Sequence, residues 1–228
     1  MQESDGYAII ANDLSHVYQA GDLATSVLKN VCFSVAAGEF VSLVGPSGCG
    51  KTTLLTLIGG LKPTQSGSLR VLGRELRGCS NQELLRLRSE IGIVFQAHHL
   101  MPFLTALQNV QVAMEVTLRH THKERSRRAT ELLADLGLES KIHSYPSMLS
   151  GGQKQRVAFA RAMACEPKLI LADEPTASLD RATGRDVVLT MQSRAREHGI
   201  AVLMATHDPR VIDMADRVIK IDDGQIVS

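Results

Sequence analysis

The stretch GPSGCGKT, residues 45–52, decides the fold of this 228-residue chain. It matches the pattern G-x-x-x-x-G-K-[ST] and lies between an apolar run, FVSLV, and an apolar helical pattern, TTLLTLIGG. The glycines of such a loop let backbone N–H groups point at phosphate oxygens. Lys51 would then reach the β- and γ-phosphates, and Thr52 would offer a hydroxyl to Mg²⁺. A glycine-rich turn with an incidental lysine is disfavoured, because both flanking elements have the required pattern.

A second motif, LILADEP at residues 169–175, ends in adjacent carboxylates. The four apolar residues before Asp173 predict a buried strand with a carboxylate at its tip, which suits Mg²⁺ held through water. Glu174 follows directly and is a candidate general base for an attacking water. An Asp-Glu-Pro turn after a strand is common by itself, so this interpretation depends on the phosphate loop upstream.

The segment SMLSGGQKQRVAFARA, residues 147–162, predicts a helix that begins with a capping box formed by Ser150 and Gln153. Between them, Gly151 and Gly152 each cost about 1 kcal/mol of helix propensity relative to alanine. We therefore expect another group to approach this backbone closely. A helix N-terminus with free N–H groups suits an anion. The alternative is a helix N-terminus without a ligand.

Composition points to a globular protein of one large domain, with 44% hydrophobic residues and a net charge of +1. Such a balanced charge predicts no nucleic-acid partner, since those proteins usually show a basic excess. The sequence has neither a membrane-spanning apolar window nor a signal-peptide pattern. The four cysteines form no CxxC pair, which is typical of reduced thiols in the cytoplasm.

The order of patterns predicts an α/β fold. Short β-rich runs occur at 7–11, 31–35, 40–44, 91–95, 169–172, 201–205 and 218–221. Several are apolar throughout, as in buried parallel strands. The stretch from about residue 97 to residue 164 has helical periodicity and no convincing strand. We predict one domain, 1–228, with an α/β core from 1–96 and 165–228 and a helical subdomain at 97–164.

These motifs give the chain a resemblance to the ATP-binding subunits of ABC transporters, and the resemblance covers almost the whole sequence. They occur in the family's order: the loop at 45–52, Gln96 after IGIVF, LSGGQ at 149–153, Asp173 with Glu174, SLD at 178–180, and His207 after AVLMAT. The resemblance implies a P-loop NTPase (RecA-like) core with a parallel sheet, an N-terminal antiparallel β portion and an inserted helical subdomain. It also implies an ATPase that uses ATP and Mg²⁺.

The resemblance further implies a role for each motif. Two copies would form an ATP-sandwich dimer, in which LSGGQ of one copy closes over the γ-phosphate held by the other. The implied catalytic residues are Glu174, His207, Gln96 and Lys51, and the implied Mg²⁺ ligands are Thr52, Gln96 and Asp173. The implied nucleotide contacts are Tyr18, Gly45, Pro46, Ser47, Gly48, Cys49, Gly50, Lys51, Thr52, Thr53, Ser150, Gly151, Gly152, Gln153 and Asp180.

Two of these roles have plain structural alternatives. Tyr18 would stack on adenine, but an aromatic residue there could instead be partly buried core. A lone histidine such as His207 at the end of a strand could be a structural hydrogen-bonding residue.

Within the family, QAGDLATSVLKNVCFSV, LTLIGGLKPTQSGSLRVLG and FQAHHLMPFLTALQNV resemble the lipoprotein-release and macrolide-export group, and most of all the DevA-like subunits of glycolipid exporters. That likeness implies a place on the cytoplasmic face of the inner (plasma) membrane, bound to a multi-spanning permease. A periplasmic adaptor and an outer-membrane channel would complete the complex, and a lipid-like or amphiphilic cargo would move outward.

Two other functions stay open. One is a low-turnover nucleotide-binding scaffold of a membrane complex, as in cell division. The other is a soluble ABC ATPase outside transport. The latter is disfavoured because no sustained heptads separate the loop from the acidic pair, and the chain has a single cassette.

Two segments are candidates for contact with a membrane or a membrane protein. Residues 97–107 carry Leu100, Met101, Phe103 and Leu104 beside a polar loop, as a partner site would. These side chains could equally pack the helical insert onto the core. The basic run RHTHKERSRR at 119–128 is either a solvated helix face or a site for anionic lipid headgroups.

Overall fold

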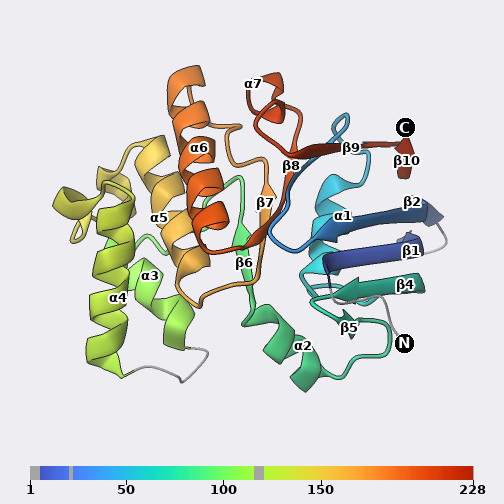
Figure 1. Ribbon diagram of the computed structural model, residues 1–228, viewed down its shortest axis with the longest axis horizontal. Helices are drawn as coiled ribbons and strands as arrows, with labels where there is room; N and C mark the ends of the chain where they lie inside the picture. The colour runs from blue at the N-terminus through green and yellow to red at the C-terminus, as the bar shows by residue number, and fades with distance from the viewer. Residues whose placement is uncertain (1–5, 21–22, 116–120, 228) are drawn as a thin grey trace.

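The computed structural model describes residues 6–20, 23–115 and 121–227. In these residues the larger sheet has six strands in the order β10-β9-β3-β8-β7-β6 (Figure 1). Their bounds are β3 Phe40–Val44, β6 Ile91–Val94, β7 Leu169–Asp173, β8 Ala201–Thr206, β9 Arg217–Asp222 and β10 Gln225–Val227. The neighbours from β9 to β6 pair in parallel, and β10 pairs antiparallel with β9.

The apolar runs predicted to be buried parallel strands form this sheet. Along β7, Leu169 and Leu171 face one hydrophobic cluster, while Ile170 and Ala172 face another. Successive side chains of a strand point to opposite faces, so a strand buried on both faces is apolar throughout. The predictions at 40–44, 91–95, 169–172, 201–205 and 218–221 are confirmed, with ends that differ by a residue at most.

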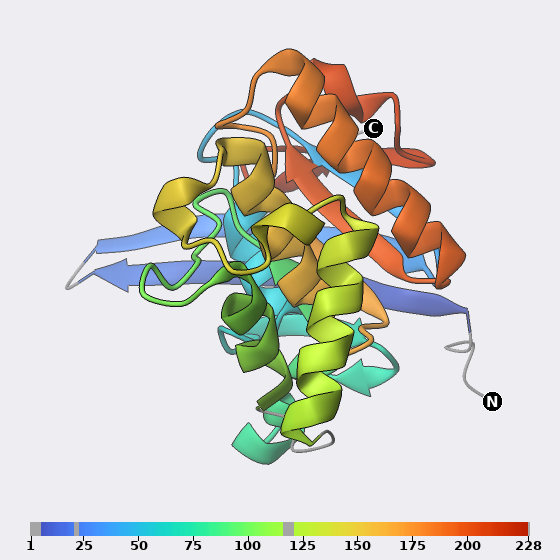
Figure 2. The ribbon, with the colours of Figure 1, turned by 90° about the vertical axis from the view of Figure 1, so that its left-hand side faces the viewer.

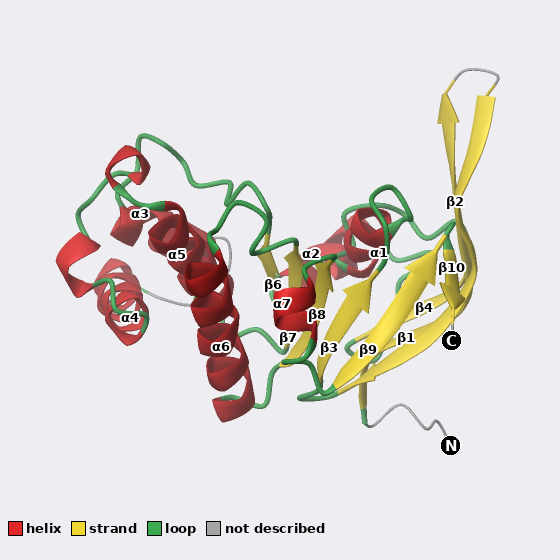
Figure 3. Cartoon of the chain, turned by 90° about the horizontal axis from the view of Figure 1, so that it is seen from above, coloured by secondary structure: helices red, strands yellow, loops and turns green. Residues whose placement is uncertain are grey.

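The second sheet is antiparallel, with the order β2-β1-β4-β5. Its strands are β1 Tyr7–Ala20, β2 Leu23–Ala36, β4 Ser66–Val71 and β5 Arg74–Glu75. The predicted runs at 7–11 and 31–35 were too short, because β1 and β2 continue into a hairpin whose far end stands out from the sheet (Figure 3). The strands β4, β5 and β10 were not predicted. The sequence of β4, SGSLRV, has weak strand propensity, and it is pairing with β1 that makes it a strand.

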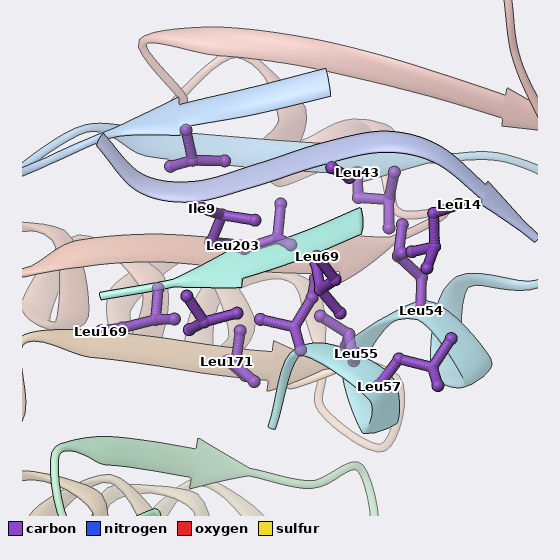
Figure 4. Packing of buried hydrophobic residues seen from close by; sticks show 14 of the residues in the cluster. Ile9, Leu14, Leu43, Leu54, Leu55, Leu57, Leu69, Leu169, Leu171 and Leu203 are labelled. Atoms are coloured by element: carbon purple, nitrogen blue, oxygen red, sulfur yellow. The ribbon is translucent and has the colours of Figure 1, made fainter. Parts of the chain in front are cut away.

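The helix that follows the phosphate loop, α1 (Lys51–Ile58), packs between the two sheets. Figure 4 shows its side chains Leu54, Leu55 and Leu57 among leucines from both sheets. Leu54 and Leu57 are fully buried. Burial from two sides holds this short helix in place, since an isolated helix of this length would be marginal in water. The phosphate loop is thereby fixed at the carboxyl end of β3.

The longer helices form a layer beside the parallel sheet, as the side view shows (Figure 2). Their bounds are α3 Ala106–Glu115, α4 His122–Asp135, α5 Gly151–Met163 and α6 Arg181–Glu197. The shorter helical elements are α2 Asn81–Arg88, α7 Pro209–Ile212, and the 3₁₀ turns η1 Glu139–Lys141 and η2 Pro146–Met148. The described part of 97–164 is helical without strands, as predicted. Whether it is a separate subdomain stays a prediction, since α5 packs closely on β6.

The basic run at 119–128 is described from Thr121 onward, so Arg119 and His120 lie outside the described residues. Within α4, Arg127 pairs with Glu131. Arg128 donates to the carbonyl oxygen of Ala164 and pairs with Glu166, beyond the end of α5. In the part of the chain that the structure describes, no helix is long and apolar enough to cross a membrane.

Candidate functional site

The glycines of the phosphate loop are required for different reasons. Gly48 and Gly50 have φ angles of 82° and 108°, in the left-handed region that glycine tolerates. A Cβ at Gly48 would meet nothing within 4 Å, so the loop is open on that side. Gly45 has no such φ, but a Cβ there would lie 2.1 Å from the carbonyl oxygen of Ile221 in β9. Gly45 is therefore required by the close approach of another strand, and not by the turn.

The ammonium of Lys51 lies over the loop. Its Nζ donates to the carbonyl oxygens of Gly45 at 2.7 Å and Pro46 at 3.0 Å, and it lies 3.9 Å from Oε1 of Glu174. The side chain is 7% exposed. A buried ammonium beside the free backbone N–H groups of a helix N-terminus makes this end of α1 suited to a polyphosphate.

Asp173 and Thr52 offer the kind of oxygen ligands that Mg²⁺ prefers. Thr52 Oγ1 donates to Asp173 Oδ2 at 2.9 Å. The other carboxylate oxygen, Oδ1, is buried without a hydrogen-bond partner among the described residues. Burial raises the pKa of Asp173, against the opposing effect of the Thr52 hydrogen bond. A cation would satisfy the orphan oxygen and stabilise the charged form, so these residues fit a metal ion.

The protein would contribute few ligands to such an ion. Among the described residues, no group of three or more His, Cys, Asp or Glu side chains could hold a metal. Mg²⁺ usually keeps several waters and binds one or two carboxylates together with substrate phosphates. The site therefore suits Mg²⁺ that arrives with a nucleotide.

Glu174 and His207 meet at the tips of β7 and β8. His207 Nδ1 lies 2.7 Å from Glu174 Oε1, and Glu174 N–H donates to the carbonyl oxygen of Ala205 at 2.9 Å. Glu174 has a φ of 47°, which is uncommon for a residue with a side chain. Its side chain is 12% exposed, whereas that of His207 is 60% exposed. His207 thus holds the carboxylate, and the carbonyl oxygen of Ala205 holds the backbone of the same residue.

Residues predicted from four separate motifs line one cavity of about 330 Å³, whereas Gly45, Pro46 and Cys49 of the phosphate loop do not. It is lined by Val27, Ser47, Gly48, Gly50, Lys51, Thr52, Thr53, Gln96, Asp173, Glu174 and His207. Sequence reasoning missed Val27, which lies on β2 beside the loop. No local signal marks it, because a valine in a strand is unremarkable until the strand is placed.

Tyr18 lies near this cavity with an environment that the sequence did not indicate. Its hydroxyl is 3.3 Å from Thr53 Oγ1, in the first turn of α1. The ammonium of Lys62 lies 4.3 Å from the ring centroid, and the ring of His16 meets it edge-on at 5.0 Å. The residue is 36% exposed, so it is not part of the core. An exposed aromatic ring held over the start of α1 can stack on a planar base.

The capping box at the start of α5 is confirmed. Gln153 N–H donates to Ser150 Oγ at 3.3 Å, and Ser150 N–H donates to Gln153 Oε1 at 3.0 Å. The close approach expected at the glycines has a source within the same chain. A Cβ at Gly152 would lie 2.3 Å from Thr183 Cγ2 of α6, and one at Gly151 would lie 3.1 Å from Leu179. Thr183 and Leu179 therefore require small residues at these two positions, whether or not a partner's nucleotide also approaches them.

The structure does not bring the LSGGQ segment to the cavity of its own chain. None of residues 149–153 lines it, and Ser150 is exposed. Asp180 is also outside it. The side chain of Asp180 caps α6 by accepting the N–H of Thr183 at 3.1 Å. Ser150 and Asp180 are both exposed, at the starts of α5 and α6, whereas Leu149 and Gly152 are buried.

Fold and cavity together define a P-loop ATPase domain. The family model described as "ABC transporter" matches residues 28–177. The chain belongs to the ABC transporter family, and it is an ATP-binding domain that hydrolyses ATP.

Three relatives show the family's range. The "Lipoprotein-releasing system ATP-binding protein LolD" of Anaeromyxobacter dehalogenans is 43% identical over 92% of this chain and 89% of its own length. The "Macrolide export ATP-binding/permease protein MacB" of Escherichia coli is 44% identical over 94% of this chain, which spans 33% of that protein. The "Putative hemin import ATP-binding protein HrtA" of Staphylococcus epidermidis is 42% identical over 96% of this chain and 98% of its own length.

A solved structure shows the same fold with a partner. The ATP-binding cassette MJ0796, in a dimeric post-hydrolysis state bound to ADP and Pi, superposes with a TM-score of 0.89 and 38% identity. The match covers 96% of this chain and 97% of that one.

Proposed function

We propose that this chain is the ATPase subunit of a membrane export complex, in which ATP-driven dimerisation moves a lipid-like or amphiphilic cargo outward. The observation that carries the ATPase chemistry is the meeting of Glu174 with His207 in the cavity that the phosphate loop lines. Membership of the ABC transporter family supports a role in a transport complex.

In this proposal each residue of the cavity has one task. Lys51 and His207 contact the γ-phosphate, and Glu174 polarises the attacking water as general base. Asp173, Thr52 and Gln96 hold Mg²⁺, which when bound neutralises charge on the phosphates. The loop's backbone N–H groups orient the polyphosphate, so that the γ-phosphate faces Glu174.

The working unit is a dimer of this chain. Because residues 149–153 lie outside the cavity of their own chain, the start of α5 is available to a second copy. In the dimer, Ser150 and the backbone of Gly151 and Gly152 close over the partner's γ-phosphate, with the dipole of α5 behind them. The dimeric cassette with ADP and Pi supports this arrangement.

In this proposal the permease contacts residues 97–107 and the nearby groove between α2, β6, α3 and α5. Of the apolar side chains at 97–107, Phe103 is 73% exposed and Met101 is 40% exposed. Leu100 instead packs against the helical core, so the packing interpretation holds for this residue, while the exposed Met101 and Phe103 are the part of the segment assigned to the permease. A nearby cavity of about 340 Å³ lies between α2, β6, α3 and α5.

Arg161 connects that groove with the segment after Gln96. It lines the groove, and its guanidinium donates to the carbonyl oxygens of His98 and His99 at 2.7 and 2.6 Å. Both histidines have left-handed φ angles, 60° and 48°. A helix of the permease seated in the groove would therefore press on the backbone next to Gln96.

Location and direction complete the proposal. The chain would lie on the cytoplasmic face of the inner membrane, with a periplasmic adaptor and outer-membrane channel completing a DevA-like complex. The likeness to lipoprotein-release and macrolide-export ATPases supports outward movement. In vesicles containing the chain and its permease, we expect the cargo to raise the ATPase rate and to leave the ATP-containing side. Movement of cargo into the ATP-containing side would show import. An ATPase rate that does not change when cargo is added would show a scaffold.

Phe103→Asp is expected to abolish co-purification with the permease while the isolated chain keeps its ATPase rate. The reason is that a charge placed in an apolar contact must be desolvated without a partner. Pull-down with the tagged permease measures the effect. Leu189→Asp, at an exposed leucine of α6, is the matched control. If Phe103→Asp still co-purifies, or if Leu189→Asp fails equally, the permease contact lies elsewhere.

Tyr18→Ala is expected to weaken the binding of ATP and GTP alike, by roughly 1–3 kcal/mol, because stacking tolerates any purine face. Tyr18→Phe should keep most of the affinity, since it removes only the hydroxyl near Thr53. Titration of the monomer with fluorescent nucleotides measures both. Tyr7→Ala, at an exposed tyrosine of the same strand, is the control. Unchanged affinity in Tyr18→Ala would assign the ring a structural role.

A further inference from the structure

The two loops that carry Glu174 and His207 are joined a second time, beneath the cavity. Thr176, two residues after Glu174, donates its hydroxyl to Oδ2 of Asp208 at 3.0 Å. Asp208 directly follows His207. Thr176 is fully buried, and Asp208 is 7% exposed. Neither residue lines the cavity, so this hydrogen bond joins the loops without facing a nucleotide.

Asp208 is a fixed acceptor for this hydrogen bond. The guanidinium of Arg210 donates to both carboxylate oxygens at 2.6 Å, and the N–H of Arg210 donates to Oδ1 at 3.0 Å. The N–H of Asp208 in turn donates to Thr206 Oγ1 at 3.0 Å. Arg210 lowers the pKa of Asp208 to about 2, so the carboxylate is ionised at neutral pH. Hydrogen bonds to a charged acceptor are the stronger kind.

Thr176 is equally fixed within its own turn. Its carbonyl oxygen accepts the N–H of Leu179, and the N–H of Ala177 donates to the carbonyl oxygen of Glu174. A Cβ at Gly184 would lie 3.3 Å from Thr176 Cβ, so α6 packs directly against it. The turn therefore starts at Glu174, whose φ of 47° is strained, and ends against a helix. Such strain persists only where the surroundings determine the backbone strongly.

We propose that the hydrogen bond from Thr176 to Asp208 holds Glu174 and His207 in register for hydrolysis, which makes both Thr176 and Asp208 positioning residues. The contact between Glu174 and His207 then has two supports. One is the hydrogen bond from the N–H of Glu174 to the carbonyl oxygen of Ala205 in β8, and the other is the hydrogen bond from Thr176 to Asp208. Without it, the strained turn can relax and carry the carboxylate away from the attacking water. This inference rests on the proposed role of Glu174 as the base.

Thr176→Val tests the proposal, because it removes the hydroxyl and keeps the branched shape. We expect the single-turnover rate of ATP hydrolysis to fall about 10- to 100-fold, since a misplacement of about 1 Å can cost that much. ATP affinity should be unchanged, and Thr176→Ser should restore the rate. Thr64→Val is the matched control, because Thr64 is also buried but its hydroxyl has no partner among the described residues. Thr176→Ala, which also removes the hydroxyl, should act as Thr176→Val does, and it replaces the valine variant if that variant does not fold.

Three outcomes would overturn the proposal. They are a parental rate in Thr176→Val, a parallel loss of ATP affinity, and a failure of Thr176→Ser to restore the rate. Glu174→Gln, measured alongside, separates this inference from the proposed function. If Glu174→Gln is inactive and Thr176→Val is not, only the positioning role is wrong. If Glu174→Gln itself hydrolyses ATP, the base assignment is wrong.

Discussion

Glu174→Gln is expected to lower ATP hydrolysis by about 10²–10⁴-fold, the contribution typical of a general base. The amide keeps the size of the side chain and can still hydrogen-bond His207, but it cannot accept a proton from water at neutral pH. Nucleotide binding should survive, because Glu174 is assigned to the water alone. Phosphate release under single-turnover conditions measures the rate, and nucleotide titration measures the affinity.

The same variant should accumulate as an ATP-bound dimer, since hydrolysis is what reopens the closed pair. Gel filtration resolves that dimer from the monomer.

His207→Ala should also hydrolyse ATP slowly but should trap the dimer less firmly, because it loses a γ-phosphate contact. Asp173→Asn should damage binding and turnover together, since Asp173 serves the metal. Glu131→Gln, at an exposed glutamate of α4, is the control for a lost carboxylate. A near-parental rate in Glu174→Gln would move the base role to His207, since the amide of Gln96 can orient the water but cannot accept its proton.

Ser150→Phe is expected to abolish ATP-dependent dimerisation while the monomer keeps its nucleotide affinity. The isolated chain should be a monomer that dimerises on addition of ATP and Mg²⁺, and a phenyl ring at the start of α5 would block the approach of the partner's γ-phosphate. Ser150 is the better site for this test than Gly152, whose Cβ would strike Thr183 within the same chain. Light scattering with and without ATP measures the dimer.

Loss of a helix cap has its own cost, about 0.5–2 kcal/mol, and needs a control. Ser80→Phe provides this control. Ser80 forms a capping box of the same kind with Glu83 at the start of α2, and it is also exposed. This variant should lose similar stability and dimerise normally. Should Ser150→Phe lose monomer nucleotide binding as severely as Lys51→Ala, the assignment of LSGGQ to the partner's site would be wrong.

The sequence alone determined the features whose residues are close neighbours along the chain. The phosphate loop, the Asp173 and Glu174 pair and the capping box at Ser150 each span only a few residues, so spacing defines their geometry. The parallel strands were equally readable, because a strand buried on both faces must be apolar throughout. The order of these motifs along the chain indicated the ABC transporter family.

Tertiary structure alone decided which distant residues meet. The requirement for glycine at 45 comes from Ile221, and that at 152 comes from Thr183, far along the chain. Val27 lines the cavity because β2 passes beside the loop. The strand β4 exists because β1 pairs with it. Such contacts leave no local pattern, since a valine, threonine or serine fits many neighbours, and packing selects among them only when the whole chain has folded.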